Sequence, residues 1–422
     1  MIKRRKTREV KIGNLIVGGE HAVTVQSMTT TKTHDVTATL KEIERLEEAG
    51  CQIIRITVPD QPAADALYEI KKRMNVPLVA DIHFNYRMAL EAVDAGADKI
   101  RINPGNIGGK KRVKEVLDKV KNANLPIRIG VNAGSLEKDL IDKYGYPTPE
   151  AMVESAKRHI DICKEHDFND IIVSLKASDV NLMMASYELF SKKFDYPVHL
   201  GVTEAGPTKS GTIKSSVGIG ALLSKGIGDT IRVSLTDDPV EEVRVGFEIL
   251  KSLGLASKGV TIVACPTCGR LEVDLFKIAG EMEEKLQNVK TPMTVALMGC
   301  AVNGPGEATH TDLGIAFGKG AGHLYYQGEN RGKVSEEEAI DKLEEMITEF
   351  ESDTSSGKTT IFKDGEIQEK VKGIWALDFH YWVAGQCGLA RGVDYAEKYG
   401  RGSQAQAIAT ALAKWANQKE VV

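Results

Sequence analysis

The stretch LVADIHFNYRMALEAVDAGADKIRIN, residues 78–103, contains the repeating unit from which the fold can be predicted. Its first part, 78–84, is a short apolar run of the kind that forms a buried strand. Ala95-Gly96 closes a helical segment, and glycine is typical of a helix end just before a strand. Residues 99–103 then form the next predicted strand. The stretch therefore predicts a strand–helix–strand unit with short connections.

The same unit recurs along the first 250 or so residues, which favours an α/β fold. Amphipathic helical patterns lie between the strand-like runs, for example at 38–49, 113–122, 149–165 and 240–253. Eight units fit a TIM (β/α)8 barrel better than an open doubly wound sheet, and no G-x-G-x-x-G motif follows the first strand. The predicted strands are 22–28, 53–58, 78–84, 99–103, 127–132, 171–176, 198–203 and 230–235.

Polar side chains stand at the carboxyl ends of these predicted strands. In a TIM barrel those ends form the mouth that carries the active site. The candidates are Gln26, Ser27, Arg55, Asp81, His83, Arg101, Asn103, Arg128, Asn132, Lys176, His199, Glu204, Arg232 and Ser234.

The predicted mouth holds four arginines and a lysine, more cations than carboxylates. Buried cations without partners are costly, so such a ring indicates a polyanionic ligand, and arginine forks suit phosphate oxygens. The alternative is an ion network within the barrel, in which the cations pair with Asp81, Glu204 or Asp237.

A second group of residues follows the barrel. It consists of Cys265-Pro-Thr-Cys268 and, some thirty residues on, Met298-Gly-Cys300-Ala-Val-Asn303-Gly-Pro-Gly306-Glu307. Two thiolates at C-x-x-C spacing can face one ion or cluster edge, and an apolar strand at 293–298 would deliver Cys300 to the same point. The glycine-rich turn leaves backbone N–H groups nearby for sulfide or another anion. Glu307 is the nearest charged candidate for a fourth ligand.

Spacing alone leaves three readings of these cysteines open. They can hold an iron–sulfur cluster, or zinc with Glu307 or His310 as the last ligand, or they can act as a redox dithiol. Cys51 and Cys163 lie in apolar helical contexts and are expected in the core.

The sequence predicts a compact α+β unit for the segment that carries the cysteines. Strands are predicted at 259–264 and 293–298, a hairpin at 313–317 and 323–327, and helices at 274–289 and 335–352, the second opened by a capping box of Ser335 and Glu338. The expected domains are 1–255, the barrel; 256–352, the cysteine unit; and 353–422, a linker at 353–359 with an extension of unassigned role. That extension holds Trp375, Trp382, Trp415 and Cys387.

Composition excludes several classes of protein. The formal charge of −4 with mixed signs argues against a nucleic-acid binder. No apolar run reaches membrane-spanning length, and the first thirty residues lack a signal-peptide core. Six cysteines in 422 residues do not make a disulfide scaffold, so we expect a cytoplasmic protein.

Taken together, the barrel and cysteine motifs resemble the 4-hydroxy-3-methylbut-2-enyl diphosphate synthase family of the non-mevalonate isoprenoid pathway. The resemblance covers residues 5 to 350 or so and excludes the extension. In the barrel it rests on 25–28, 81–84, 101–105, 128–135 and 203–206, and in the cysteine unit on 264–270 and 298–308.

The resemblance implies an oxidoreductase with a [4Fe-4S] cluster on Cys265, Cys268, Cys300 and Glu307, in a domain of the sulfite/nitrite reductase type. The implied substrate is 2-C-methyl-D-erythritol 2,4-cyclodiphosphate, which two electrons from ferredoxin or flavodoxin convert to the allylic diphosphate. Glu204 would supply a proton. The implied diphosphate contacts are Arg101, Arg128, Asn132, Lys176, Arg232 and Ser234, with His83, His199 and Asp81 as secondary contacts and Arg55 and Asn103 also at the mouth.

Two other classes of protein stay open at this stage. One is a zinc-stapled barrel enzyme, such as an aldolase or a pterin-type synthase. The other is an iron–sulfur carrier or sensor whose barrel only binds a metabolite. The connection near 253–259 is short and follows the last barrel helix at the face opposite the mouth. We therefore expect a head-to-tail homodimer in which each cysteine unit covers the barrel mouth of the partner chain. The resemblance also implies this arrangement.

Overall fold

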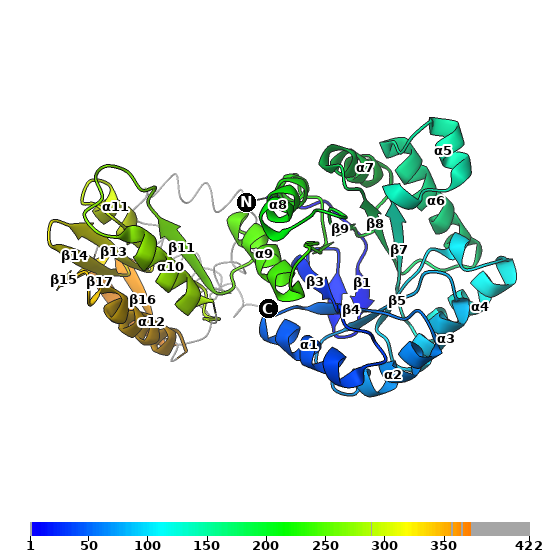
Figure 1. The fold of residues 1–422 in the computed structure, drawn as a ribbon, viewed down its shortest axis with the longest axis horizontal. Helices are drawn as coiled ribbons and strands as arrows, with labels where there is room; N and C mark the ends of the chain where they lie inside the picture. The colour runs from blue at the N-terminus through cyan, green and yellow to red at the C-terminus, as the bar shows by residue number, and fades with distance from the viewer. Residues whose placement is uncertain (1, 288, 356–357, 364–365, 373–422) are drawn as a thin grey trace, which may run out of the picture. The chain divides into compact units, whose positions relative to one another are not determined.

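A computed structural model describes residues 2–287, 289–355, 358–363 and 366–372, with side chains described through 355. The chain forms two compact units, Met1–Lys258 and Gly259–Val422. Figure 1 shows a ring of strands and helices in the first unit and a smaller sheet with helices in the second. Each unit is described below by itself.

The first unit is the TIM barrel that the sequence predicted. Its strands are β3 (Thr24–Met28), β4 (Ile53–Thr57), β5 (Leu78–Asp81), β6 (Lys99–Arg101), β7 (Ile127–Asn132), β8 (Ile171–Lys176), β9 (His199–Leu200) and β10 (Thr230–Ile231). They pair in parallel in the order β8-β7-β6-β5-β4-β3-β10-β9. A parallel bridge from Val173 to Val198, just before β9, joins the two ends of this sheet.

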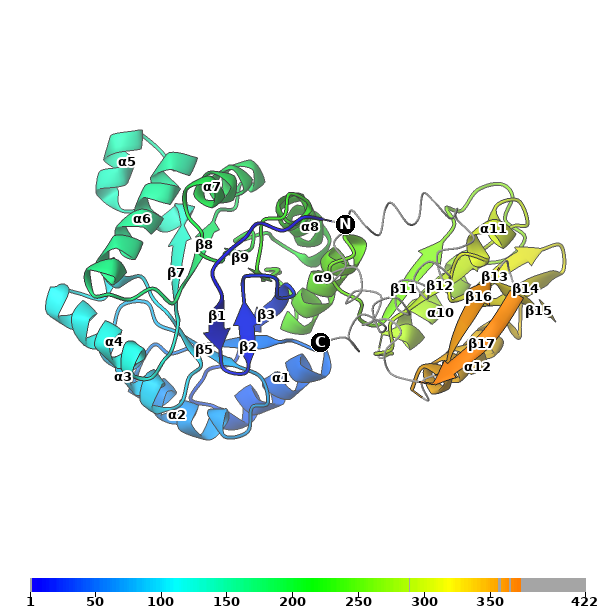
Figure 2. The same ribbon diagram turned by 180° about the vertical axis from the view of Figure 1, so that it is seen from behind.

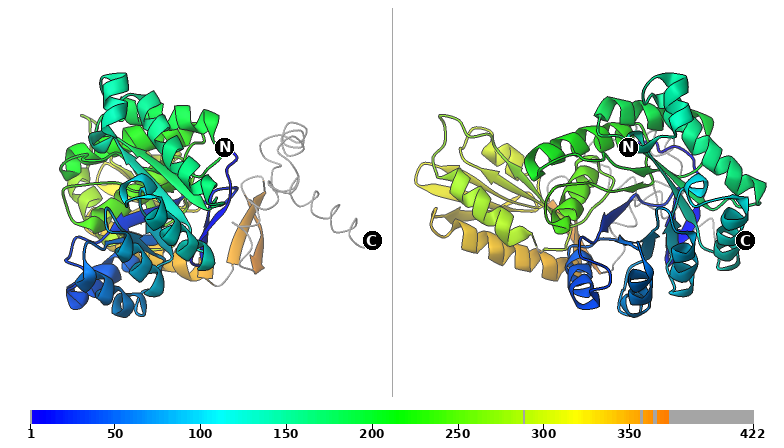
Figure 3. Two further views of the ribbon diagram at one scale, coloured as in Figure 1. Left: turned by 90° about the vertical axis from the view of Figure 1, so that its right-hand side faces the viewer. Right: turned by 45° about the vertical axis from the view of Figure 1, so that its right-hand side comes forward.

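Helices surround the strands, and α1 to α4 stand side by side in Figure 3. Asp35, Asp60, Asn85 and Asp179 cap helix N-termini by accepting hydrogen bonds from backbone N–H groups two or three residues on. Gly50 and Gly96 have φ of 85° and end α1 and α3 in the left-handed conformation that glycine adopts at no steric cost. The helices are α1 (Val36–Glu48), α2 (Gln61–Lys71), α3 (Tyr86–Asp94), α4 (Lys110–Asn122), α5 (Lys138–Tyr144), α6 (Pro149–Glu165), α7 (Val180–Lys193), α8 (Thr208–Ser224) and α9 (Pro239–Ser252), with short 3-10 turns η1 (Pro104–Asn106) and η2 (Ala133–Ser135).

An antiparallel hairpin of β1 (Val10–Ile12) and β2 (Leu15–Val17) lies across one end of the barrel (Figure 2). Val10, Ile12 and Val17 form one apolar cluster with strand residues of β4, β5 and β8, namely Ile53, Val79 and Ile172. The hairpin thus plugs the end at which these strands begin. Strands of three residues gave no signal in the sequence, so this plug was not predicted.

Most strands are shorter than predicted, and except in β3 the difference falls mainly at their carboxyl ends. The run predicted as 78–84 pairs only through Asp81, and the run predicted as 230–235 only through Ile231. The polar residues that follow leave the sheet and turn toward the mouth. This is the expected behaviour of side chains that line a site rather than the core.

The second unit has a mixed five-stranded sheet in the order β11-β12-β13-β14-β15. β11 to β13 are parallel, and β14 and β15 continue the sheet in antiparallel fashion. Helices α10 and α12 cover one face, and α11 packs on the other. The elements are β11 (Val260–Ala264), α10 (Leu275–Leu286), β12 (Met293–Met298), α11 (Gly304–Ala308), β13 (Leu313–Gly318), β14 (Ala321–Tyr326), β15 (Glu329–Val334) and α12 (Ala339–Ser355).

The α+β prediction for this unit is therefore confirmed, whereas β15 was not predicted. Ser335 accepts a hydrogen bond from the Glu338 backbone at 3.3 Å, as the capping box requires. The expected linker at 353–359 is wrong in part, because α12 extends to Ser355 and a hairpin of β16 (Lys358–Lys363) and β17 (Glu366–Lys372) follows. Trp375, Trp382, Cys387 and Trp415 lie outside the described residues.

Across the described residues, no helix has the length and apolar character needed to cross a membrane.

Candidate active site

A pocket of about 170 Å³ opens at the carboxyl ends of the barrel strands. Almost every strand contributes at least one side chain, as expected for a TIM-barrel mouth. The lining residues are Arg55, Asp81, His83, Arg101, Arg128, Gly130, Val131, Asn132, Ser174, Lys176, Thr203, Arg232 and Ser234. Nine of the residues that the sequence predicted for the site are among them.

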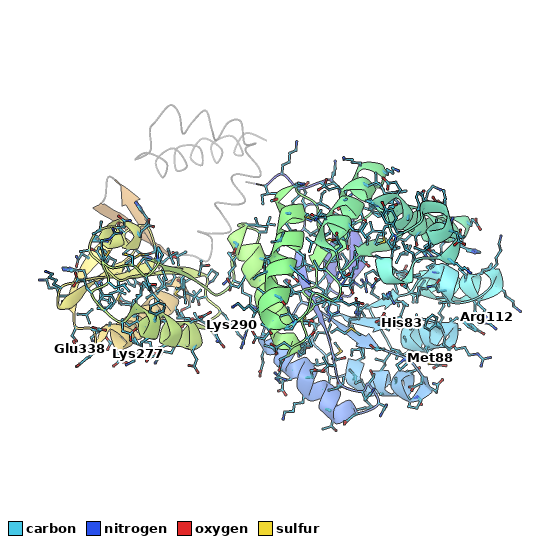
Figure 4. The ribbon with its side chains drawn as sticks, turned by 45° about the horizontal axis from the view of Figure 1, so that its top comes forward. His83, Met88, Arg112, Lys277, Lys290 and Glu338 are labelled. Carbon is cyan, nitrogen blue, oxygen red and sulfur yellow. The ribbon has the colours of Figure 1, made fainter. Side chains whose placement is uncertain are left out.

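Asp81, at the end of β5, is a carboxylate on which several cations of the pocket converge. It lies 3.3 Å from Arg101 Nη1, 3.6 Å from Arg55 Nε and 3.9 Å from His83 Nε2. Burial by itself would raise the pKa of Asp81, but Arg55 and Arg101 outweigh it and hold that pKa below its usual value. His83, which is labelled in Figure 4, is half-exposed, and burial lowers its pKa although Asp81 opposes the shift. Asp81 therefore stays ionised and holds Arg55 and Arg101 in place.

Gly130 on β7 makes room for the Arg101 side chain. A Cβ atom at this position would lie 2.7 Å from Arg101 Nε, too close for any other residue without movement. The backbone of Gly130 also bonds Asn103, accepting from its amide at 2.9 Å and donating to its oxygen at 2.8 Å. Asn103, predicted as a mouth residue, is thus committed to the barrel wall and does not line the pocket.

A second carboxylate, Glu242 on α9, binds the pocket residue Arg232 from outside the barrel and was missed by the sequence analysis. It accepts two hydrogen bonds from Arg232, at 3.0 and 3.1 Å, and one from Ser27 Oγ at 2.9 Å. It also accepts from the Leu235 backbone at 3.1 Å. The signal that could have revealed it is a glutamate on the buried face of the helix, beside Pro239, Val243 and Gly246. Charged residues are rarely buried without a specific partner.

Arg128 and Lys176 have no such partner in the part of the chain that the structure describes. Arg128 is 1% exposed and donates to Ser174 Oγ at 3.0 Å. Burial, and then the neighbouring Arg55 and Arg101, push its pKa well below its usual value. Burial followed by Arg232 and Arg128 does the same to the pKa of Lys176. An arginine does not give up its proton in proteins, so the pocket holds positive charge that an anion would stabilise.

Like Asn103, the predicted residues Gln26, Ser27, His199 and Glu204 do not line the pocket. His199 on β9 is fully buried, and its Nδ1 lies 3.3 Å from Thr230 Oγ1. Glu204 is exposed on the loop after β9, next to the lining residue Thr203, and it has φ of 54°. A residue other than glycine seldom adopts this left-handed conformation, and such strain is concentrated at functional sites. The loop thus places Glu204 next to a residue that lines the pocket.

The predicted cysteine ligands lie in the second unit, on two loops at the carboxyl end of its parallel strands. Cys265 directly follows β11 and Cys300 follows β12 by two residues. The Gly299 N–H donates to Cys265 Sγ at 3.3 Å, and the Glu272 N–H donates to the Gly299 carbonyl at 3.0 Å. These bonds hold the two loops side by side.

The donors on these loops fit iron–sulfur chemistry. A backbone hydrogen bond from Val302, assisted by the Arg270 side chain, lowers the pKa of Cys300 and so favours the thiolate that binds metal. Cys268 is exposed, and Glu307 is exposed on α11. Among the described residues, no three His, Cys, Asp or Glu side chains converge closely enough to hold a single metal ion. The ligand set therefore stays a prediction.

The fold and the pocket define an enzyme with a cationic TIM-barrel mouth, extended by a separate unit that presents cysteines on two loops. The GcpE TIM-barrel domain matches residues 7–247, and the GcpE protein C-terminal domain matches residues 261–349. The chain belongs to the GcpE family and is an oxidoreductase.

Similar curated proteins carry one name, 4-hydroxy-3-methylbut-2-en-1-yl diphosphate synthase (flavodoxin). That of Geobacillus thermodenitrificans is 60% identical over 347 residues, which is 82% of this chain and 93% of the relative. That of Anoxybacillus flavithermus is 58% identical over 359 residues, or 85% of this chain and 99% of the relative. Among solved structures, dihydropteroate synthase from Xanthomonas albilineans covers 59% of this chain and 100% of its own, with 14% identity and a TM-score of 0.43. A similarity of that size says nothing about activity.

Proposed function

We propose that this chain reduces 2-C-methyl-D-erythritol 2,4-cyclodiphosphate to (E)-4-hydroxy-3-methylbut-2-enyl diphosphate. The reaction consumes two electrons, opens the cyclic diphosphate and removes one hydroxyl group as water. The observation that carries the proposal is the pocket of excess positive charge in a barrel whose relatives bear the name of this diphosphate synthase.

The electrons would pass through a [4Fe-4S] cluster held by Cys265, Cys268, Cys300 and Glu307. When bound, such a cluster supplies electrons one at a time and offers one iron with a displaceable ligand. The hydrogen bonds to Cys265 Sγ and Cys300 support this assignment, because donors to sulfur stabilise thiolate ligands.

The residues of the barrel would bind and orient the substrate. Arg128 and Lys176, which lack carboxylate partners among the described residues, are the natural contacts for diphosphate oxygens. Asp81 and Glu242 keep the forks of Arg101 and Arg232 in fixed positions. Binding the substrate in one fixed orientation keeps the reacting groups close together and aligned, which accounts for a large part of catalysis.

Glu204 would donate a proton to the departing hydroxyl. Its place at the rim beside Thr203 supports this role, since a general acid must come within hydrogen-bond reach of the leaving group. The Glu204 side chain is exposed, and catalytic contacts often tighten only when substrate binds.

Anaerobic turnover of the cyclodiphosphate with a strong reductant tests the proposal directly. A brown protein with about four irons per chain that forms the allylic diphosphate is the expected result. Zinc in place of iron would favour the zinc-stapled barrel enzyme. A loaded cluster without consumption of the cyclodiphosphate would favour the electron carrier or sensor.

Flavodoxin is the electron donor that the relatives' name suggests, and we propose it for this chain in preference to ferredoxin. Reduction of the bound cluster by each purified donor, followed by rapid mixing, would decide between them. A cytoplasmic location, expected from the cysteine content, remains a prediction.

We also propose a head-to-tail homodimer that completes each site from two chains. Helix α9 ends at Ser252 and β11 begins at Val260. Lys258 Nζ donates to the carbonyl of Ala49, which ends α1 just before β4 begins, so the chain leaves the barrel at the end opposite the mouth. The barrel is as long as its helices, and α9 spans about 21 Å, so a chain held at Lys258 is poorly placed to bring its own cysteines to its own mouth. A partner chain in a twofold arrangement removes this difficulty.

Mixing two inactive chains tests the shared site. One chain carries Glu204→Gln and the other Cys300→Ser, and the two are allowed to exchange subunits. If sites form between chains, each mixed dimer has one intact site and activity returns. Verified mixed dimers that stay inactive would exclude the shared arrangement while leaving the proposed reaction untouched.

A further inference from the structure

Lys99 on β6 lies one inward position below the pocket. Lys99 pairs in register with Val79, and Arg101 pairs with Asp81. Because alternate residues of a strand share a face, Lys99 enters the barrel interior on the same side as the pocket residue Arg101, about 7 Å further down. Val79 belongs to the apolar cluster that plugs the barrel. Lys99 therefore lies between the plug and the cationic pocket.

The Lys99 amino group has no compensating partner among the described residues. Its side chain is 0% exposed, and Nζ makes no hydrogen bond to any described residue. The charged groups that act on it are Arg128 on β7 and Arg55 on β4, and both are cations. Asp81, the carboxylate of the same region, is engaged by Arg55 and Arg101.

Other polar side chains at this level of the barrel are equally short of partners. His199 Nε2 on β9, both amide atoms of Gln26 and the Thr24 hydroxyl on β3 are buried without hydrogen bonds to described residues. The positive charge of Arg128 also acts on His199. The layer is thus polar and electropositive, and within the described part of the chain no carboxylate acts on Lys99.

Both burial and neighbouring cations favour the neutral form of a lysine. Burial first, and then Arg128 and Arg55, lower the pKa of Lys99 well below its usual value. An anion in the pocket would reverse the second of these effects, because it would neutralise the field of the cations that lie directly above Lys99.

We propose that Lys99 is neutral in the unliganded barrel and takes up one proton from solvent when an anionic diphosphate occupies the pocket. The step forms one N–H bond and breaks none in the substrate. Once protonated, Lys99 compensates negative charge of the bound anion. It thereby strengthens anion binding although it lies below the residues that line the pocket. The identity of the anion rests on the proposed function, whereas the proton uptake rests on the charges of the barrel.

The groups that face Lys99 define how the coupling depends on pH. They are Arg128 and Arg55, which stay charged, and His199, which is the other base able to accept a proton in this layer. Between the pKa values of Lys99 in the unliganded and liganded states, binding should strengthen as the pH falls, since protons are taken up on binding.

Calorimetric titration of the oxidised, cluster-loaded protein with the cyclodiphosphate measures this uptake, because no turnover occurs without reductant. The binding enthalpy is recorded at one pH in HEPES, PIPES and Tris, whose ionisation enthalpies differ. We expect the uptake in Lys99→Met to be roughly one proton smaller than in the native protein, because Lys176, whose pKa is lowered in the same way, contributes equally to both. Lys114→Met, a change at an exposed lysine of α4, is the matched control and should keep the full uptake.

Lys99→Arg is the second variant. It retains a positive charge, and it keeps the proposal testable if Lys99→Met does not fold. It should bind the anion with the same loss of roughly one proton of uptake as Lys99→Met, and its affinity should depend less on pH than that of the native protein. Absence of uptake in the native protein, or full uptake in both Lys99 variants, would overturn the proposal, and uptake that disappears in His199→Gln alone would assign the proton to His199 instead.

A parallel titration with sulfate separates this proposal from the proposed function. Sulfate carries two charges and does not titrate near neutral pH. If the cyclodiphosphate fails to bind, the proposed substrate is wrong, and the sulfate titration still decides whether Lys99 takes up a proton.

Discussion

The barrel pocket and the cysteine loops differ in how their functional side chains are held in place. The pocket is buried, and its cations are held by Asp81, Glu242 and the strand ends before any ligand arrives. The loops around Cys265 and Cys300 are partly exposed and tied to one another by a few backbone hydrogen bonds. The barrel thus holds unfavourable positive charge that an anion can relieve, whereas the proposed ligands on the loops do not converge on one point among the described residues. The predictions below test this contrast.

Cys300→Ser should have the largest effect, with loss of the cluster and of all turnover. Because the pocket lies in the other unit, binding of the cyclodiphosphate should persist. Iron content, the visible spectrum and calorimetry on the same sample measure both properties. Glu307→Ala should be milder and leave a more labile cluster. A fully loaded and active Cys300→Ser protein would contradict the ligand assignment.

Glu204→Gln should reduce turnover by roughly 10²–10⁴-fold, the usual range for loss of a general acid, while substrate affinity is retained. Single-turnover rates with a pre-reduced cluster measure the chemical step apart from electron delivery. Near-normal rates would make the strained loop at Glu204 a structural feature of the rim.

Arg128→Met should act on affinity more than on folding. Loss of a charge-assisted contact to a phosphate oxygen costs about 1.5–3 kcal/mol, or roughly 10–100-fold in binding. The unliganded protein should not lose stability, because a buried cation without a carboxylate partner has been removed. Calorimetry measures the anion affinity of this variant, and urea unfolding measures its stability. Unchanged affinity would remove Arg128 from the anion site.

Lys99→Met should have the smallest effect, a gain in stability that depends on pH. Burial, then Arg128 and Arg55, lower the pKa of Lys99 in the folded protein, whereas the unfolded chain recovers the usual value of about 10.4. The folded state therefore binds fewer protons between these two values, so native stability rises with pH across that window. The stability gained by Lys99→Met should be greatest below the pKa that Lys99 has in the folded protein, and it should decrease toward about pH 10. Urea unfolding at pH 7 and pH 9 measures it, and an advantage independent of pH would show that packing, not charge, is responsible.

Much of this protein could be read from local patterns. The eight barrel strands were placed because apolar runs and glycine at helix ends are properties of neighbouring residues, as in 78–103. The mouth residues followed from the same pattern, since strand ends in a TIM barrel share one face. Nine of them line the pocket, from Arg55 on β4 to Ser234 after β10. The two cysteine motifs were equally visible from their spacing.

Tertiary structure alone decided which charges are paired. Glu242 approaches Arg232 from a helix outside the barrel, and Asn103 is taken up by the backbone of Gly130. Lys99 looked like an ordinary strand residue in the sequence and is buried among cations in the fold. Periodicity depends on residues a few positions apart, whereas the free energy of a buried charge depends on groups brought together from distant strands. For that reason the sequence could name the site residues, and only the packed barrel could show which of them need an anion.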